Sequence, residues 1–413
     1  MDVFGEVRSI LQEPASMLSF FKLRDLFQDG TCPEEVFVYI DEHLQKWPPD
    51  ILRYPPHSWL SDDGGELPAM VAFCNAFRLN TPDVGYDVVF SWLDSPRWRD
   101  IVYLALPSFR ISSEQWLELG KIEALQSLVS LDLTFCDLGS GRIDAICALP
   151  FVGDLQTLSV GHNGLGEDGL DALARVPWTQ IETLRLRSNR IDAFSLGPLV
   201  RGEHWASLRS LDLSLNPIGQ DGASRLANVE ALDGVTALSL NNCNITSDGL
   251  EALVSGRGFS KLEVLDLSLC AIDDLSRNTH RLSRFQNLRA LKLHANRLRV
   301  DNLEHLLADD VVPRLEELDL SVTAQGEKSL YLLAQCDRFE SLRRLKLAGN
   351  YISPEGARAL AYAPWLANLE AFDLGLVADA EFDVVEAFAN SLHLPAELKQ
   401  PWVKRFQRLC DAM

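Results

Sequence analysis

The sequence lacks any apolar run long enough to cross a bilayer, and residues 1–6 lack the basic and apolar regions of a secretory signal peptide. We therefore expect a cytoplasmic protein with no membrane partner. Basic residues are also scarce, because 38 Lys and Arg stand against 59 Asp and Glu, which leaves a net charge of −21. Such a charge opposes binding to nucleic acid or anionic lipid. It favours a basic or mixed-charge protein partner, or it simply keeps the chain soluble and monomeric.

Patterns of catalytic and metal-binding residues are missing as well. The eight cysteines show no Cys-x-x-Cys spacing, and the eight histidines form no His-x-x-x-His pair. The sequence contains no glycine-rich phosphate loop and no nucleophile elbow. These absences predict a protein that is not an enzyme and that carries no metal and no cofactor.

What the chain does contain is a short phrase, Leu-x-x-Leu-x-Leu-x-x-Asn/Cys-x-Ile/Leu, with clear copies beginning at Leu208 and Leu342. The leucine that opens the Leu-x-Leu pair, or its substitute, recurs every 26 or 27 residues at Leu104, Leu131, Leu158, Leu184, Leu211, Leu238, Leu265, Leu291, Leu318, Leu345 and Phe372. This fixed period indicates a solenoid of about eleven repeats.

Each repeat combines a short strand with a helical second half. The leucines of Leu-x-Leu point to one side of a strand, and the residue between them points to the other. The segments 167–174 and 353–360 place apolar residues at helical spacing, with Asp or Pro near the start. Parallel strands joined by wider helices predict an α/β solenoid, a horseshoe with the sheet on its concave face and helices on its convex face.

The motif and its helical second half resemble the leucine-rich-repeat family, and most of all its ribonuclease-inhibitor-like class. The resemblance implies that amide side chains in the Asn/Cys column satisfy buried backbone groups and are structural, namely Asn163, Asn189, Asn216, Asn296 and Asn350. Cys136, Cys243 and Cys270 occupy the same column and are expected to be reduced structural thiols. Departures from the motif predict local irregularity in repeats nine and eleven, at Thr323, Gln325, Val377 and Asp379.

Three parts are predicted along the chain: a helical N-terminal domain at 1–97, the repeat array at 98–392, and a C-terminal capping helix at 393–413. Helices are expected at 16–27, 33–47, 66–79, 82–93, 381–392 and 396–413. The N-terminal domain either caps the exposed apolar end of the array or acts as an adaptor that brings a second partner.

Charged residues alternate in sign on five successive strands. One column holds Asp266, Lys292, Asp319, Lys346 and Asp373, and a second holds Glu263, Arg289, Glu316, Arg343 and Glu370. Because residues in a column are neighbours on a parallel sheet, we expect two ladders of lateral salt bridges. Each exposed pair is worth only about 0.2–1 kcal/mol, and its main effects are to cancel charge and to fix register.

Candidate partner-binding residues lie on the strands and in the turns that follow them. Three arginines project from one strand and its turn, and a weaker basic group follows later; the two groups are Arg185, Arg187 and Arg190, and Lys292, His294 and Arg297. Arginine suits the recognition of carboxylates. Apolar residues recur where the strand leaves the inner face, at Phe135, Leu215, Leu269, Val322 and Leu376. The alternatives are internal pairing of the arginines and burial of the apolar side chains against neighbouring turns.

The sequence therefore favours a non-enzymatic protein-binding scaffold that uses the concave face of a leucine-rich-repeat array. One alternative is an adaptor or effector whose N-terminal domain docks a second partner. The other is a GTPase regulator, by similarity to GTPase-regulating repeat proteins. The partner protein is not identified by the sequence.

Overall fold

The computed structural model describes residues 3–48, 50–60, 66–79, 84–201, 204–276, 282–324, 326–375 and 382–411. The chain forms two compact units, unit 1 (Met1–Leu184) and unit 2 (Arg185–Met413). Strands β1 to β12 follow one another in chain order in a sheet that does not close on itself. Every strand pair given for the described residues is parallel.

Unit 1 begins with helices and then takes up the strand and helix alternation. Its strands are β1 (Ala76–Arg78), β2 (Tyr103–Ala105), β3 (Ser130–Asp132) and β4 (Thr157–Ser159), and β5 (Thr183–Arg185) lies at the border with unit 2. Its helices are α1 (Val3–Leu11), α2 (Met17–Asp25), α3 (Glu34–Leu44), α4 (Tyr86–Leu93), α5 (Ser113–Leu119), α6 (Gly139–Cys147) and α7 (Gly166–Arg175). Short 3₁₀ turns are η1 (His57–Trp59), η2 (Ala69–Phe73), η3 (Glu123–Leu125) and η4 (Val152–Asp154).

Unit 2 continues the alternation. Its strands are β6 (Ser210–Asp212), β7 (Ala237–Ser239), β8 (Val264–Asp266), β9 (Ala290–Lys292), β10 (Glu317–Asp319), β11 (Arg344–Lys346) and β12 (Ala371–Asp373). Its helices are α8 (Gly197–Arg201), α9 (Gly219–Leu226), α10 (Thr246–Ser255), α11 (Val300–Ala308), α12 (Glu327–Gln335), α13 (Pro354–Ala361), α14 (Phe382–Ala389) and α15 (Ala396–Asp411). The 3₁₀ turns are η5 (Glu230–Leu232), η6 (Leu282–Arg284), η7 (Val312–Arg314) and η8 (Pro364–Asn368).

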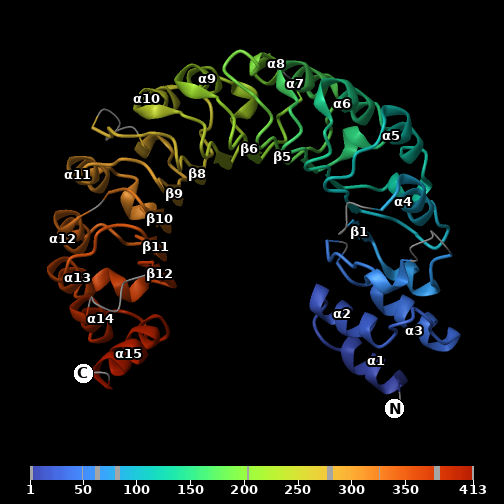
Figure 1. Ribbon diagram of the computed structural model, residues 1–413, viewed down its shortest axis with the longest axis horizontal. Coiled ribbons are helices and arrows are strands. Elements are labelled where there is room, and N and C mark those ends of the chain that lie inside the picture. The colour runs from blue at the N-terminus through green and yellow to red at the C-terminus, as the bar shows by residue number, and fades with distance from the viewer. Residues whose placement is uncertain are drawn as a thin grey trace. The chain divides into compact units, whose positions relative to one another are not determined.

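The core of each repeat lies between its strand and its helix, as the sequence predicts. In unit 2, Leu211 pairs with Leu238, and Leu238 with Leu265, so the leucines of successive strands form one buried row. Figure 1 shows the helices of unit 2 on one side of this row of strands, with the strands along the inner side of its bend. The residues between the leucines therefore form an accessible strand side, which is the surface that could meet a partner.

Most of the expected helices are present, with ends shifted by a few residues. The predictions at 16–27, 33–47, 381–392 and 396–413 correspond to α2, α3, α14 and α15. The helix expected at 82–93 begins at Tyr86, and residues 82 and 83 lie outside the described residues. Helix α1 was not expected from the sequence. The domain limits 1–97, 98–392 and 393–413 stay a prediction.

The helix expected at 66–79 is wrong. This segment forms the turn η2 and then strand β1, which pairs with β2 in the register Phe77 to Leu104. The backbone of Asn75 already takes part in the hydrogen bonding between β1 and β2, because its carbonyl accepts a hydrogen bond from the Val102 N–H at 2.8 Å. Its side-chain Oδ1 also accepts from the Arg53 N–H at 2.8 Å. Strand pairing therefore begins inside residues 1–97, one period before Leu104.

Repeat nine tolerates its departure from the motif. Thr323 is buried in the asparagine column, and its hydroxyl donates to the Leu320 carbonyl at 2.5 Å. Its N–H donates to Oδ1 of Asn350 at 3.0 Å. The other irregular positions, Gln325, Val377 and Asp379, lie outside the described residues, as does Leu376. In the part of the chain that the structure describes, no helix is long and apolar enough to span a membrane.

Candidate protein-binding surface on the strand side

A turn with left-handed backbone follows each strand of unit 2 from β5 to β10. The residues at this turn have φ between 54° and 57°, and we call them the rim row: Ser188, Leu215, Asn242, Leu269, Ala295 and Val322. Their N–H groups donate to carbonyls of the next repeat; for Leu269 and Val322 the acceptors are His294 and Ala348, both at 2.8 Å. Because these bonds fix the backbone, each rim side chain has a set direction out of the turn.

Two apolar side chains of the rim row are exposed. Leu269 keeps 44% of its surface accessible and Val322 keeps 48%, whereas Leu215 is half-buried. A left-handed conformation costs a non-glycine residue roughly 1–2 kcal/mol. Exposed apolar groups recover little of that cost by burial, so folding alone does not explain why they occupy this position. Burial against neighbouring turns, one of the two alternatives left open by the sequence, is therefore incomplete for these side chains.

Phe135 occupies the same turn position in unit 1. It has φ 64° and is 49% exposed. Its ring stacks on the imidazole of His162, with ring centroids 4.1 Å apart and planes inclined by 14°. The sequence analysis did not anticipate this pair, although His162 lies one period after Phe135 in the same column.

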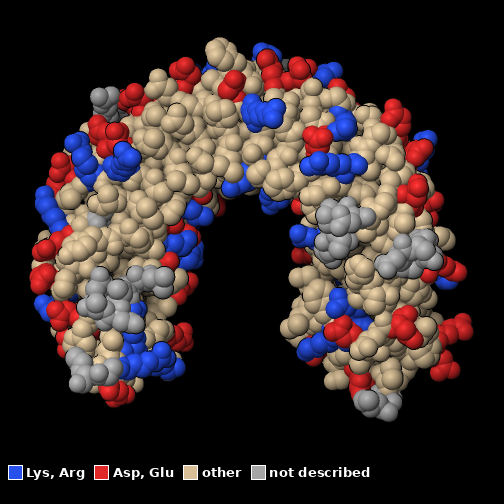
Figure 2. Space-filling view, in the orientation of Figure 1, with Lys and Arg blue, Asp and Glu red and all other residues tan. Residues whose placement is uncertain are grey.

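The three arginines predicted as a group lie in two places: Arg185 and Arg187 on the strand side at the end of β5, and Arg190 in the turn that follows. Arg185 and Arg187 are exposed and alternate with the buried Leu186, so they share the strand side. Arg190 is exposed beyond the buried Asn189, at a second left-handed position with φ 59°. In Figure 2, several Lys and Arg side chains of unit 2 line its inner, strand-bearing edge.

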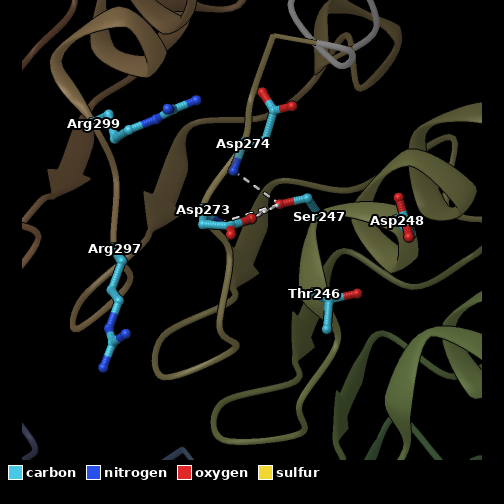
Figure 3. Close-up of a pocket in the computed structure, with 7 residues that line it drawn as sticks. All are labelled: Thr246, Ser247, Asp248, Asp273, Asp274, Arg297 and Arg299. Atoms are coloured by element: carbon cyan, nitrogen blue, oxygen red, sulfur yellow. Dashed lines mark hydrogen bonds between the residues drawn. The ribbon is translucent and has the colours of Figure 1, made fainter.

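The second basic group is divided by the structure. Lys292 and His294 are half-buried on the strand side, at β9 and just after it. Arg297 is exposed and lines a polar cavity of about 550 Å³ together with Arg299, Asp273 and Asp274. Figure 3 shows Arg297 pointing away from the contact in which Ser247 Oγ donates to Asp273 Oδ1 at 3.0 Å. Arg297 therefore does not extend the surface formed by Lys292 and His294.

The alternating charge columns lie side by side, as predicted, but they form ladders only in part. Asp266 and Asp319 both register against Lys292, and Asp319 registers against Lys346. Among the described residues, ion pairs within the columns join Lys346 to Asp319 at 3.7 Å and Arg289 to Glu316 at 2.7 Å. Arg343 instead donates to the Asn368 carbonyl at 3.2 Å.

The aspartates of the strand-side column also act locally. Asp212, Asp266, Asp319 and Asp373 each accept a hydrogen bond from the backbone N–H two residues later, at 2.7–3.0 Å. This Asx turn starts the bend that leads to the rim row. The acidic members of the column are therefore partly engaged in shaping the turn, and they are not simply counterions for the lysines.

The sequence analysis missed a further column on the strand side, formed by the residue just before the leucine that opens each Leu-x-Leu pair. There Glu317 accepts from Arg344 Nε at 3.0 Å and from Lys346 Nζ at 3.3 Å. Burial is the largest influence on the Glu317 carboxyl and raises its pKa. The hydrogen bonds from Arg344 and Lys346 and the charges of Lys346 and Lys292 outweigh it, and the pKa is lowered. The signal was present, because the two-residue period places 317 and 319 on one face.

The cysteines of the asparagine column are structural. Cys136 and Cys243 donate to the carbonyls of Leu106 and Leu213 at 3.0 and 3.1 Å. Burial raises the pKa of both thiols to about 12, so they stay protonated at neutral pH. Among the described residues, no group of three or more His, Cys, Asp or Glu is placed to hold a metal ion.

The repeats match a known family model. The model described as Leucine Rich repeat matches residues 124–147, 154–174, 206–227, 235–254, 260–276 and 340–361. The chain is 27% identical over 248 residues to ribonuclease inhibitor of Sus scrofa, a match that covers 57% of this chain and 48% of that protein. The chain thus spans about half the length of this relative.

Two solved structures align with the chain at low sequence identity. A chain of the Rad7 and Elc1 complex from yeast is 19% identical with a TM-score of 0.48, covering 75% of this chain and 77% of that chain. A leucine-rich-repeat protein of Leptospira interrogans is 14% identical with a TM-score of 0.34, covering 75% and 95%. The repeat motif, the parallel strands and the matched segments agree: the chain is built from leucine-rich repeats, and it is similar to ribonuclease inhibitor.

Proposed function

We propose that this chain is a non-enzymatic scaffold that holds another protein on the strand side of unit 2. The observation that carries the proposal is the pair of exposed apolar side chains, Leu269 and Val322, held in left-handed turns of the rim row. Backbone strain kept beside exposed apolar surface is more useful to binding than to folding. The similarity to a protein named ribonuclease inhibitor supports a role in which another protein is bound.

The charges on the strand side indicate which chemical groups a partner would present. Along this side of unit 2, the basic residues Arg185, Arg187, Lys292, Arg344 and Lys346 are matched by the acidic residues Asp212, Asp266, Glu317, Asp319 and Asp373. The strand side is therefore close to neutral in a chain that carries −21 overall. A partner that approaches it meets less repulsion than elsewhere, and its carboxylates can bind Arg187 and Arg190 in the bidentate manner that guanidinium favours.

The experiment captures partner proteins with the full chain and compares two double variants. Arg187→Glu with Arg190→Glu reverses charge on the proposed surface. Arg201→Glu with Arg257→Glu makes the same change at exposed arginines in α8 and after α10. We expect a protein retained by the wild-type chain to be lost with the first variant and kept with the second. Equal retention by both variants would contradict the proposal.

A third variant tests the apolar part of the surface. Leu269→Asp places a charge at an exposed position of the rim row, where the folded chain can keep it in water. We expect the same partner to be lost, because a charge would have to be buried in the contact. If Leu269→Asp binds normally while the arginine variant fails, the rim row is not part of the interface.

The remaining expectations keep the status of predictions. They are the lack of nucleic-acid and membrane partners, the monomeric state, the cytoplasmic location and the lack of catalytic activity. The partner-binding roles of Arg185, Phe135, Leu215, Lys292, His294 and Arg297 are predictions as well. Regulation of a GTPase has no specific support in the described residues, whereas a cavity near the N-terminus bears on the adaptor alternative.

A further inference from the structure

Unit 1 contains a cavity of about 590 Å³ that the repeat motif does not explain. It lies between helix α2, the segment that follows Leu52, and strand β1, which are far apart in sequence (Figure 1). Its inner wall includes Phe77 and Trp92, which are buried, and the half-buried Phe21. A volume in this range suits a ligand of two or three amino-acid residues.

The walls of the cavity are held in place by hydrogen bonds between segments. The Arg53 guanidinium donates to the Phe73 carbonyl at 2.7 Å, which ties the segment at Leu52 to the turn before β1. The Trp59 indole donates to the Phe27 carbonyl at 3.1 Å, which ties the same segment to the end of α2. Because these contacts anchor both ends of the wall, the cavity is preorganised and little ordering is needed on binding.

Polar groups at the cavity mouth are basic or neutral. Arg24, Arg78 and His57 line it, and no acidic side chain does so among the described lining residues. Arg24 already binds Asp25 at 2.9 Å and lies over the Phe21 ring, so the exposed Arg78 supplies most of the available charge. A cationic mouth in a chain of net charge −21 is a local reversal of sign.

Tyr54 lines the cavity beside these cations, and its hydroxyl is hydrogen-bonded to Tyr103. Burial, assisted by the neighbouring Tyr103, raises the pKa of Tyr54 to about 12, so its hydroxyl keeps its proton at neutral pH. The two rings meet edge to face with centroids 5.8 Å apart. Tyr103 begins β2 and precedes the buried Leu104, so the Tyr54 ring lies next to the strand side of unit 1.

We propose that this cavity binds a peptide segment of a partner protein in which a large apolar side chain stands next to a carboxylate. The apolar side chain lies along the wall formed by Phe21 and Trp92, and the carboxylate meets Arg78 with Arg24 nearby. A peptide fits better than a compact anion, because the apolar wall is deep and the charge lies only at the mouth. This site is independent of the surface proposed in unit 2, and either can fail without the other.

The test uses short peptides and the full chain, with binding followed by isothermal titration calorimetry and saturation-transfer NMR. The probes are acetyl-Leu-Phe with a free carboxylate, acetyl-Phe-Glu-amide, and acetyl-Leu-Phe-amide, which has no carboxylate. We expect at least one acidic probe to bind roughly ten-fold more tightly than the neutral amide, as a charge-assisted hydrogen bond provides. The acidic probe that binds more tightly shows whether a chain terminus or an internal acidic residue is preferred.

Two variants locate the binding. Arg78→Gln should reduce the affinity for the acidic probe to that for the neutral amide. The affinity for the neutral amide should not change. Arg110→Gln removes the same charge from another exposed arginine of unit 1, outside the cavity. It should change neither the affinity for the acidic probe nor the affinity for the neutral amide. Equal affinity for acidic and neutral probes, equal effects of the two variants, or no binding of any probe at low millimolar concentration would overturn the proposal.

Discussion

At the scale of single residues, the buried asparagines hold neighbouring repeats together. Asn216 is 1% exposed and uses its whole amide. Its Nδ2 donates to the carbonyls of Leu186 and Leu213 at 2.9 and 2.8 Å, and its Oδ1 accepts from Asn189 and Ile191 at 2.7 and 3.1 Å. One side chain thus satisfies backbone groups of two repeats, which is the structural role that the motif predicts.

Asn216→Ala should therefore be costly. The change leaves several buried backbone groups without partners, each worth about 1–3 kcal/mol, and we expect a loss of roughly 2–4 kcal/mol. Urea unfolding measures this as a lower midpoint. Asn228→Ala, at an exposed amide that donates only to Ser224, should shift the midpoint little. A similar small shift for both variants would mean that water replaces the Asn216 contacts.

The backbone of Val322 is strained. A β-branched residue with φ 54° is unfavourable, whereas asparagine tolerates this conformation. We expect Val322→Asn to raise the unfolding midpoint, by about 0.5–1 kcal/mol in stability, while it weakens binding of a captured partner. A lower midpoint would contradict this, and it would show that the packing of Val322 over Gly349 outweighs the strain.

At the scale of elements, the sequence predicted well wherever the motif was complete. Leucine spacing located β2 to β12, because each strand buries the same side of a regular period. It missed β1, since Cys74 and Phe77 stand where leucine or isoleucine occurs elsewhere, and their spacing with Met70 also suits a helix. Counting one period back from Leu104 would have found Phe77. The cavity in unit 1 was beyond prediction, because it joins three separate segments.

The close approach of α10 to the end of α9 requires a glycine just after α10. A Cβ at Gly256, just after α10, would lie 2.1 Å from the Ala227 carbonyl oxygen at the end of α9. Because backbone cannot yield easily, we expect Gly256→Ala to cost about 1–3 kcal/mol in unfolding experiments. Gly326→Ala, where a Cβ has nothing within 4 Å, is the matched control. Equal midpoints for the two variants would show that α9 and α10 can separate without cost.

The carboxylate of Glu317 links strands β10 and β11 in a pH-dependent way. Its pKa is lowered in the folded state, since Arg344 and Lys346 together outweigh burial. A lowered folded pKa contributes stability above the unfolded value of about 4.3, and that stability is lost as the pH falls through the folded value.

We expect Glu317→Gln to cost about 1 kcal/mol at neutral pH and progressively less below the unfolded pKa, as measured by urea midpoints across pH. Glu340→Gln, at an exposed position, should show no such trend. A loss that is independent of pH would mean that the charge of Glu317 contributes nothing and that its packing alone is important.

At the scale of the whole molecule, function depends on an uneven distribution of charge. The chain carries −21, yet its strand side in unit 2 has matched charges and its cavity in unit 1 has a cationic mouth. The sequence predicted the repeat array, and it named Arg187 and Leu269 as binding residues. It did not predict that Arg297 would line a separate polar cavity, because motif spacing gives the column of a residue and not the direction of a long side chain.

The central claim is that unit 2 binds another protein with its strand side. Hydroxyl-radical footprinting of the full chain, alone and with a purified captured partner, measures this most directly, because leucine and aromatic side chains react when they are exposed. The account predicts protection of Leu215 and Leu269, with unchanged labelling of Phe194 and Tyr362, which are exposed beside the helices. Protection of Phe194 and Tyr362, with the rim row still labelled, would contradict it.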